Sequence, residues 1–170
     1  MNATRCILLA GSLLIASTGM VAETNKEGPK SEGKAMNAPA ITIGYVVLYV
    51  KDVAASLAFY EEAFGLTRRF YNDDQGKAYG EVETGVCRLA FYNFALARTQ
   101  FKVFTPAASD KAPLGFEISL VTSDVPALFA RAVKAGATVV NEPTTKPWGQ
   151  TTACLRDKDG HTVSLCTPLP

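Results

Sequence analysis

The chain has 170 residues, of which 48% are hydrophobic and 19% are charged, and its formal net charge is +1. This composition predicts one globular domain with an ordinary core. The near-neutral charge, together with the lack of a basic run interleaved with aromatic residues, argues against a nucleic-acid-binding protein.

The first 22 residues have the order of a secretory signal peptide. Arg5 is the only charge before an apolar run at residues 6–16, and small residues around Ala22 offer a cleavage site. The run is short for a bilayer span, which favours a signal over an uncleaved anchor. We therefore expect a periplasmic or secreted protein that has no membrane contact after cleavage.

Residues 23–40 are rich in Glu, Lys, Gly, Pro, Ser and Asn and show no apolar period. Such a segment buries too little surface to offset the entropy of ordering it. We expect a disordered tether here, followed by a folded domain over residues 41–170.

Residues 45–66 predict a strand, a capped helix and a glycine stop. β-Branched and aromatic residues alternate with period two over residues 45–50. Asp52 then stands where a helix N-cap belongs, and Gly65 suits the left-handed position after the helix. Further strand-like runs follow at residues 68–71, 79–84 and 87–93.

The same order of elements recurs over residues 117–137. Asp124 repeats the N-cap of Asp52 at an offset of 72 residues. Strand-like runs then follow at residues 138–140, 150–156 and 161–167. The repeat predicts two βαβββ modules, which occupy residues 41–93 and 114–168 and are joined by a long connection at 94–113.

Three cysteines remain after the signal: Cys87, Cys154 and Cys166. Three thiols cannot all pair within one chain, and their spacing fits no zinc pattern. We interpret them as small buried hydrophobic residues and leave their redox state open.

The last hairpin predicts which residues share a face of the sheet. The segment from Asp157 to Gly160 suits a three-residue loop that pairs Asp157 with His161, so Ser164 is expected opposite Cys154. One face then carries Trp148, Gln150, Thr152, Cys154, Thr162, Ser164 and Cys166. The aliphatic face opposite carries Ala153, Leu155, Val163 and Leu165 and is expected to pack under the helices.

The same alternation applies to the other strands. It places Tyr45 and Tyr49, in the first strand of the first module, and Glu117, in the first strand of the second module, on the open face. It also places Leu89 and Phe91 there, from the last strand of the first module. An apolar cleft with a few polar groups is typical of a small-molecule site. The predicted binding residues are Tyr45, Tyr49, Phe91, Glu117, Trp148, Gln150, Cys154 and Ser164.

Structural explanations for some of these aromatic residues stay open. Trp148 either plugs a barrel end or supports a ligand. Tyr45 and Tyr49 are either core aromatics with satisfied hydroxyls or ligand contacts.

The polar residues around the last turn are expected to face solvent. His161, the only histidine, follows a turn and is predicted to be an exposed loop residue. Arg156 and Asp157 are expected to form a solvated turn edge. Glu117 differs, because a carboxylate on an inward strand position between apolar neighbours is hard to explain by packing. It either pairs with an arginine or tyrosine or serves a functional site.

Three segments carry a family resemblance: residues 47–66 (Val-Leu-Tyr-Val-Lys-Asp-Val…Phe-Tyr-Glu-Glu-Ala-Phe-Gly-Leu), 121–125 (Val-Thr-Ser-Asp-Val) and 146–163 (Lys-Pro-Trp-Gly-Gln…Leu-Arg-Asp-Lys-Asp-Gly-His-Thr-Val). With them the sequence resembles the vicinal oxygen chelate superfamily, which contains glyoxalase I, bleomycin-resistance proteins and extradiol dioxygenases. The resemblance covers residues 41–169. It implies an α+β fold in which two pseudo-symmetric βαβββ modules form a half-open eight-stranded barrel, glyoxalase-like, around a cleft.

Metal-dependent members of that superfamily place one ligand at the start of each module's first strand and one in each module's last strand. The positions that match here hold Tyr45, Leu89, Glu117 and Ser164. Leu89 has no donor atom, whereas a catalytic divalent ion needs about three N or O ligands from the protein. We therefore expect no metal and no cofactor.

Two functions follow from these interpretations, and whether the protein is an enzyme is left open. The first is an exported, metal-free binding protein that holds a small aromatic or cationic compound, as the resemblance to bleomycin-resistance proteins implies. The second is a lyase or isomerase in which Glu117 is a catalytic acid or base. A weaker alternative is an interaction module with a vestigial cleft. The expected partner is a small-molecule ligand, and a homodimer is left open.

Overall fold

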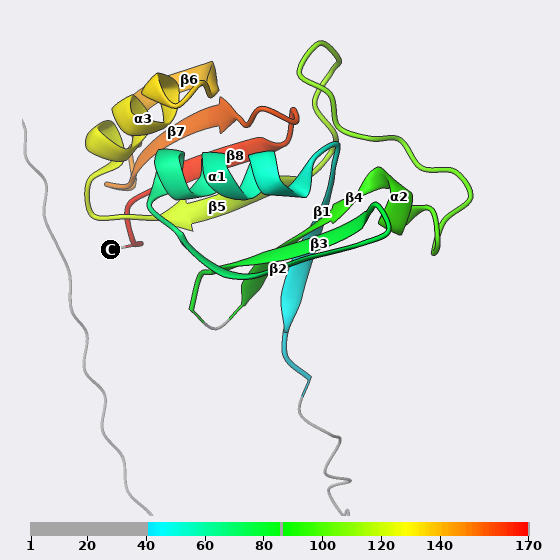
Figure 1. The fold of residues 1–170 in the computed structure, drawn as a ribbon. Coiled ribbons are helices and arrows are strands. Elements are labelled where there is room, and N and C mark those ends of the chain that lie inside the picture. Colours follow the sequence, from blue (N-terminus) through cyan, green and yellow to red (C-terminus); the bar gives the residue numbers. More distant parts are fainter. Residues whose placement is uncertain (1–40, 86, 170) are drawn as a thin grey trace, which may run out of the picture. The chain divides into compact units, whose positions relative to one another are not determined.

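The computed structural model describes residues 41–85 and 87–169 (Figure 1). The predicted signal peptide at residues 1–22 and the predicted tether at 23–40 lie outside the described residues. Within the described part of the chain, no helix is long and apolar enough to cross a membrane.

The first module has the predicted βαβββ order. Its elements are β1 (Tyr45–Val50), α1 (Val53–Phe64), β2 (Thr67–Asp74), β3 (Lys77–Glu83) and β4 (Arg88–Asn93). The strands form one sheet in the order β1-β4-β3-β2, in which β1 and β4 are parallel and the other pairs are antiparallel. The helix begins where the sequence predicts, because the Asp52 side chain accepts the N–H of Ala55, and it ends at Gly65 in the left-handed conformation.

The second module repeats this order after a connection that contains one short helix. Its elements, with that helix first, are α2 (Phe94–Ala97), β5 (Glu117–Val121), α3 (Val125–Lys134), β6 (Thr138–Thr145), β7 (Thr151–Arg156) and β8 (Thr162–Cys166). The sheet order is β5-β8-β7-β6, which matches the first sheet strand for strand. Asp124 caps α3 by accepting the N–H of Ala127, as Asp52 does for α1.

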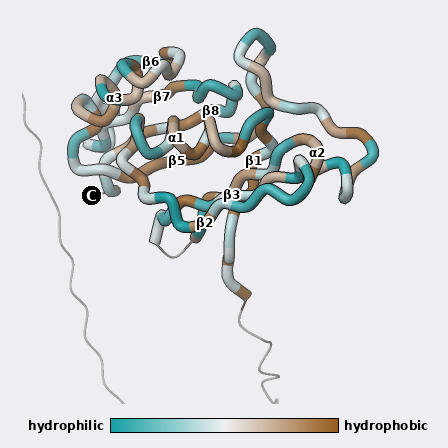
Figure 2. Tube along the Cα trace, viewed as in Figure 1, coloured by the Kyte–Doolittle hydropathy of each residue, from teal (hydrophilic) through white to brown (hydrophobic). Residues whose placement is uncertain are grey.

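The structure confirms the predicted fold class of two βαβββ modules. Among the described strands, none from one sheet pairs with a strand of the other, so the two sheets do not close into a continuous barrel. Strand β2 is an edge of the first sheet: most of its residues are coloured as hydrophilic in Figure 2, and all eight are exposed.

One hydrophobic core is shared by both modules. Buried side chains of the first sheet, such as Leu48, belong to the same cluster as buried side chains of the second, such as Leu165. Helix α1 contributes Leu57 and Tyr60 to this cluster and also packs against α3. The inner face of each sheet therefore stabilises the fold, and the outer faces carry the remaining side chains.

Arg131 of α3 joins the two helices by polar contacts. Its guanidinium donates to the backbone carbonyl of Glu61 at 2.9 Å and to that of Glu62, at the last turn of α1. The Glu61 carbonyl also accepts the N–H of Gly65 at 3.0 Å, so Arg131 adds a second donor there and supplies one to Glu62. A side chain of the second module therefore completes the end of a helix in the first.

Strand β4 presents the opposite faces from those predicted. Leu89 and Phe91 pair with Val46 and Leu48 of β1 and are buried in the core, so their expected place on the open face is wrong. Gly85 lies three residues before β4, whereas Gly160 lies two residues before β8. Aligning the modules on these turn glycines therefore misplaced the strand by one residue, which exchanges its two faces.

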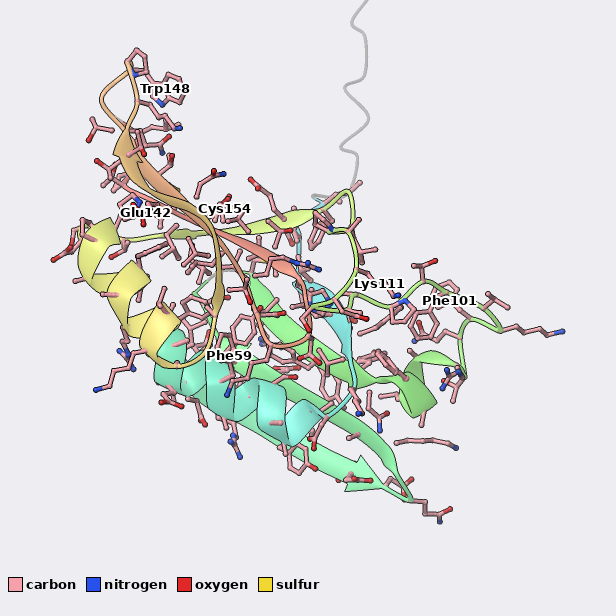
Figure 3. All side chains as sticks on the ribbon, turned by 90° about the horizontal axis from the view of Figure 1, so that it is seen from above. Phe59, Phe101, Lys111, Glu142, Trp148 and Cys154 are labelled. Atoms are coloured by element: carbon pink, nitrogen blue, oxygen red, sulfur yellow. The ribbon has the colours of Figure 1, made fainter. Side chains whose placement is uncertain are left out.

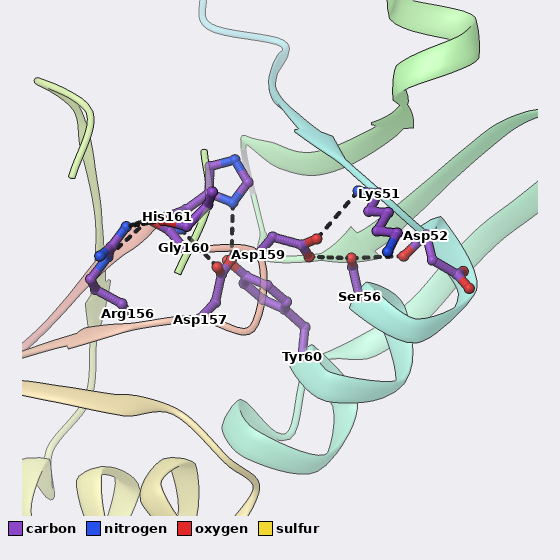
Figure 4. Close-up of polar contacts among 10 residues, drawn as sticks. Lys51, Asp52, Ser56, Tyr60, Arg156, Asp157, Asp159, Gly160 and His161 are labelled. Atoms are coloured by element: carbon purple, nitrogen blue, oxygen red, sulfur yellow. Dashed lines mark hydrogen bonds and ion pairs between the residues drawn. The ribbon is translucent and has the colours of Figure 1, made fainter. Parts of the chain in front are cut away.

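The last hairpin has the predicted register. The N–H of Asp157 donates to the carbonyl of His161 at 3.0 Å, and Cys154 lies opposite Ser164. However, Asp157 is only 2% exposed and His161 only 6%, so the expectation of a solvated turn with an exposed histidine is wrong. Helix α1 covers this turn through the contact of Tyr60 with Asp157 (Figure 4), and the connection covers it through the Ala108 carbonyl, which accepts from Arg156.

Candidate functional site

Three of the predicted site residues meet on the outer face of the second sheet. The Ser164 hydroxyl of β8 donates to Oε2 of Glu117 at 3.0 Å, and Cys154 of β7 lies opposite Ser164. They line a hollow of about 400 Å³, which we call the Glu117 hollow. Its other lining residues are Asn141, Glu142, Thr144, Lys146, Thr152 and Ala153. Figure 3 shows Glu142 and Cys154 on this part of the sheet.

The Glu117 hollow is polar and open to solvent. Glu117 is exposed and does not occupy the inward position that the sequence predicted, because this outer face has no helix over it. Its partner in the structure is Ser164, not one of the arginine or tyrosine side chains considered from the sequence. Two carboxylates and one ammonium group, those of Glu117, Glu142 and Lys146, give the hollow an excess of acceptors over donors.

Cys154 is a weak nucleophile in this hollow. Burial raises the pKa of its thiol above the usual value, the hydrogen bond with Ser164 lowers it in part, and the charge of Glu117 raises it further. The reactive form of a cysteine is the thiolate. The thiol therefore remains protonated near neutral pH and contributes shape and a weak hydrogen-bond donor.

This pKa shift predicts how Cys154 reacts with iodoacetamide. In a chain whose other cysteines are replaced by serine, the alkylation rate is expected to rise with pH along a profile displaced above that of an ordinary thiol. Glu117→Gln should move the profile to lower pH, because it removes a negative charge that disfavours the thiolate. Glu142→Gln is the matched control. An identical profile for Glu117→Gln and the parent would contradict the coupling.

Trp148 and Gln150 lie in the loop between β6 and β7 and form their own pair. The Trp148 indole N–H donates to Oε1 of Gln150 at 3.2 Å, and the Gln150 amide donates to the carbonyl of Thr167 at 2.7 Å. Trp148 is 57% exposed at the tip of this hairpin (Figure 3). It plugs no barrel end within the described chain, and it does not line the Glu117 hollow.

Tyr45 and Tyr49 lie on the outer face of the first sheet. Tyr45 is 56% exposed, whereas Tyr49 packs in an aromatic cluster with Tyr92 and Phe104, at ring distances of 6.0 and 5.1 Å. Phe91, also predicted as a binding residue, is fully buried in the core. The predicted residues are thus divided between two sheets and the core, and no single cleft of the described chain collects them.

The sequence interpretation missed a charged cluster on the outer face of the first sheet. The Glu81 carboxylate accepts the Tyr79 hydroxyl and lies 3.3 Å from Nε of Arg69 and 3.9 Å from Nε of Arg88. Burial, followed by the hydrogen bond to Glu81, raises the pKa of Tyr79. The alternation of Tyr79 and Glu81 within a recognised strand was the signal that could have placed both on one face.

The residues at the family's metal positions do not fit a divalent ion. With the register corrected, the four positions hold Tyr45, Ala90, Glu117 and Ser164. Ala90 has no donor, and the Ser164 hydroxyl is hydrogen-bonded to Glu117. Of the four, only Glu117 is a usual ligand for Zn²⁺ or another catalytic metal. Elsewhere in the described residues, no group of three or more His, Cys, Asp or Glu side chains is placed to hold a metal ion.

This fold and the comparison with known proteins define the class of the protein. Residues 42–165 match the model of the Glyoxalase/Bleomycin resistance protein/Dioxygenase superfamily, and the chain belongs to this family. The predicted resemblance is thereby confirmed.

Similar proteins agree with this assignment. The uncharacterized protein Mb0911c of Mycobacterium bovis is 29% identical over 124 residues, which cover 72% of this chain and 80% of that protein. A glyoxalase-related enzyme from Fulvimarina pelagi has a TM-score of 0.63 at 21% identity, with 75% of this chain and 88% of that chain covered. A glyoxalase/bleomycin resistance protein/dioxygenase family enzyme from Burkholderia phytofirmans PsJN has a TM-score of 0.59 at 21% identity, with 75% and 98% covered. These structures share the fold.

Proposed function

We propose that this member of the family binds a small molecule in the Glu117 hollow, without a metal, after export by its N-terminal signal. The observation that carries the proposal is the contact between Glu117 and Ser164, two lining residues of a hollow of about 400 Å³. Pockets of roughly 300–1,000 Å³ are the usual size for small-molecule sites.

The charges of the hollow favour a ligand with a cationic or donor-rich group. A carboxylate has two oxygens and about four acceptor positions, so the single hydroxyl of Ser164 leaves Glu117 able to accept from a ligand. Glu142 supplies a second carboxylate on the neighbouring rim. Hydrogen bonds that involve a charged partner are the stronger ones, which supports a ligand carrying an ammonium or a similar group.

The alternative is a lyase or isomerase in which Glu117 transfers a proton. The Ser164 hydroxyl favours this reading because a donor on Oε2 fixes the orientation of the carboxylate. A catalytic acid or base must lie within hydrogen-bond reach of the proton that it moves. The binding and catalytic alternatives therefore involve the same side chain and differ in what its replacement changes.

Glu117→Gln separates the two alternatives. A thermal-shift screen with small primary and quaternary ammonium compounds identifies a ligand, and calorimetry then compares the variants. For a binding protein, the free energy of binding should become less favourable by about 1–3 kcal/mol, the scale of a lost charge-assisted hydrogen bond. For an enzyme, turnover should fall on the order of a hundredfold or more while binding survives.

Glu62→Gln is the matched control, because Glu62 is an exposed carboxylate on α1 that lies outside the hollow. A ligand whose affinity and turnover are both the same for the parent and for Glu117→Gln would sink the binding and the catalytic alternatives together. The interaction-module alternative would then take their place.

A further inference from the structure

A second candidate site is centred on the buried turn between β7 and β8. The Asp157 carboxylate accepts the His161 backbone N–H at 2.8 Å and the Tyr60 hydroxyl at 2.9 Å, and it lies 3.2 Å from Nδ1 of the His161 ring. Burial, followed by the charge of Asp157, holds the pKa of Tyr60 well above its usual value, so this hydroxyl stays a donor. These contacts fix the imidazole of the chain's only histidine (Figure 4).

The contact with Asp157 also determines which ring nitrogen carries the proton. A carboxylate is an acceptor, so Nδ1 of His161 donates to it, and in the neutral ring Nε2 is then an acceptor. Figure 4 shows Nε2 on the side of the ring turned away from Asp157. The contact that holds the turn uses only Nδ1, so Nε2 is left to accept a hydrogen bond from another group.

His161 lines a cavity of about 190 Å³ whose other lining residues belong to β1 and to the connection. Its walls are mainly apolar and include Val47, Leu48, Pro106 and Phe116. An apolar cavity of about 150 Å³ is large enough to hold benzene. The cavity thus has the size and surface for one aromatic ring, with an oriented imidazole as its buried polar group.

We propose that this cavity binds a compact aromatic molecule with one acidic hydroxyl, a phenol or a small aromatic carboxylic acid, whose hydroxyl lies against Nε2 of His161. The hydroxyl donates to the neutral ring. If it transfers its proton, the O–H bond breaks, the proton forms the Nε2–H bond, and the oxygen keeps the electron pair. The Asp157 carboxylate, 3.2 Å from Nδ1, holds the ring in place in both cases.

This site goes beyond the proposed function, because it shares no lining residue with the Glu117 hollow. The two sites also differ in ligand chemistry. The Glu117 hollow favours cations, whereas the His161 cavity favours weak acids. Glu117→Gln should therefore leave the binding of an acidic aromatic unchanged, so that either proposal can fail without the other.

The first test uses the single imidazole as a spectroscopic probe. Long-range ¹H–¹⁵N NMR of the full chain reports the tautomer, and we expect the proton on Nδ1 in the free protein. Addition of 4-nitrophenol or benzoate should shift the Nε2 resonance, whereas 4-nitroanisole, which has a similar ring but no hydroxyl, should not. A free protein with its proton on Nε2 would overturn the proposal.

The second test uses matched variants and the same probes. His161→Asn keeps an amide donor for Asp157 but ends short of Nε2, and it should weaken 4-nitrophenol binding about tenfold or more. Leu114→Trp adds bulk at a lining residue that is 37% exposed and should block the cavity without disturbing the core. Leu169→Trp, at a residue that is 75% exposed and outside the cavity, is the control and should bind as the parent does.

Calorimetry measures each affinity, and circular dichroism confirms that each variant is folded. If His161→Asn does not fold, Leu114→Trp alone decides the question. Binding of 4-nitrophenol that persists unchanged in Leu114→Trp, or no binding to the parent chain at all, would overturn the proposal.

Discussion

Replacement of Phe91 by alanine is expected to lower the free energy of unfolding by about 3–5 kcal/mol. The Phe91 side chain is fully buried, and its ring lies 5.0 Å from the ring of Tyr60 on α1. Truncation would leave a cavity between β4 and this helix, which the rigid sheet can fill only in part. If the side chain lined an open ligand surface, as the sequence suggested, the same change would alter binding and hardly affect stability.

Tyr45→Ala is the control for this prediction. It also truncates an aromatic side chain of the first sheet, but Tyr45 is 56% exposed on the outer face. Exposed substitutions of this kind usually change stability by no more than about 0.5 kcal/mol. Urea unfolding followed by circular dichroism measures both variants. Equal, small losses would show that β4 has the register predicted from the sequence and not the one described here.

Gly160→Ala should be nearly as damaging, with an expected loss of about 3 kcal/mol or more. Gly160 has φ of +94°, a conformation that L side chains rarely adopt. A Cβ atom there would also lie 2.4 Å from the carbonyl carbon of Ala108, which is backbone and cannot rotate away. The connection between the modules would have to move off the β7–β8 turn.

Gly149→Ala separates the strain of a positive φ from the clash with the connection. Gly149 has φ of +90°, but a Cβ there would meet nothing within 4 Å. Its replacement should therefore show only the conformational strain, about 1–2 kcal/mol. The difference between the two variants in urea unfolding measures the contact with the connection. Should both lose the same amount, the connection does not lie against the turn in solution.

Local chemistry explains why most of the fold could be predicted. The N-caps Asp52 and Asp124 and the stop at Gly65 act within one helical turn, and the structure has all three in these roles. The hairpin at Gly160 likewise fixes its own register through two or three hydrogen bonds. These features depend on neighbours in the sequence, so a single sequence shows them.

The errors came from contacts between distant segments. The burial of His161 depends on the connection folding back over the turn, where the Arg156 guanidinium donates to the carbonyls of Ala108 and Lys111. No pattern of neighbouring residues in the sequence predicts such a contact. The face of Phe91 was misplaced because the two modules differ by one residue between turn glycine and strand.

In the candidate site, too, the local features could be predicted and the contacts between distant segments could not. Cys154 and Ser164 could be brought together from the hairpin register alone, and Glu117 followed from the repeat. Which sheet faces meet depends on how the modules pack, and for this reason the sequence did not show that Tyr45 and Trp148 lie outside the hollow. Glu81 was missed because its strand was recognised but its faces were not assigned.

The contact of Arg131 with the end of α1 has a consequence for folding. Without the second module, the carbonyls of Glu61 and Glu62 would lose these donors, and the first sheet would lose the buried side chains that the second module contributes to the shared core. Each half of the repeat is therefore incomplete as a folding unit. We therefore expect the two modules to fold and unfold together in one cooperative transition, despite the internal repeat of the sequence.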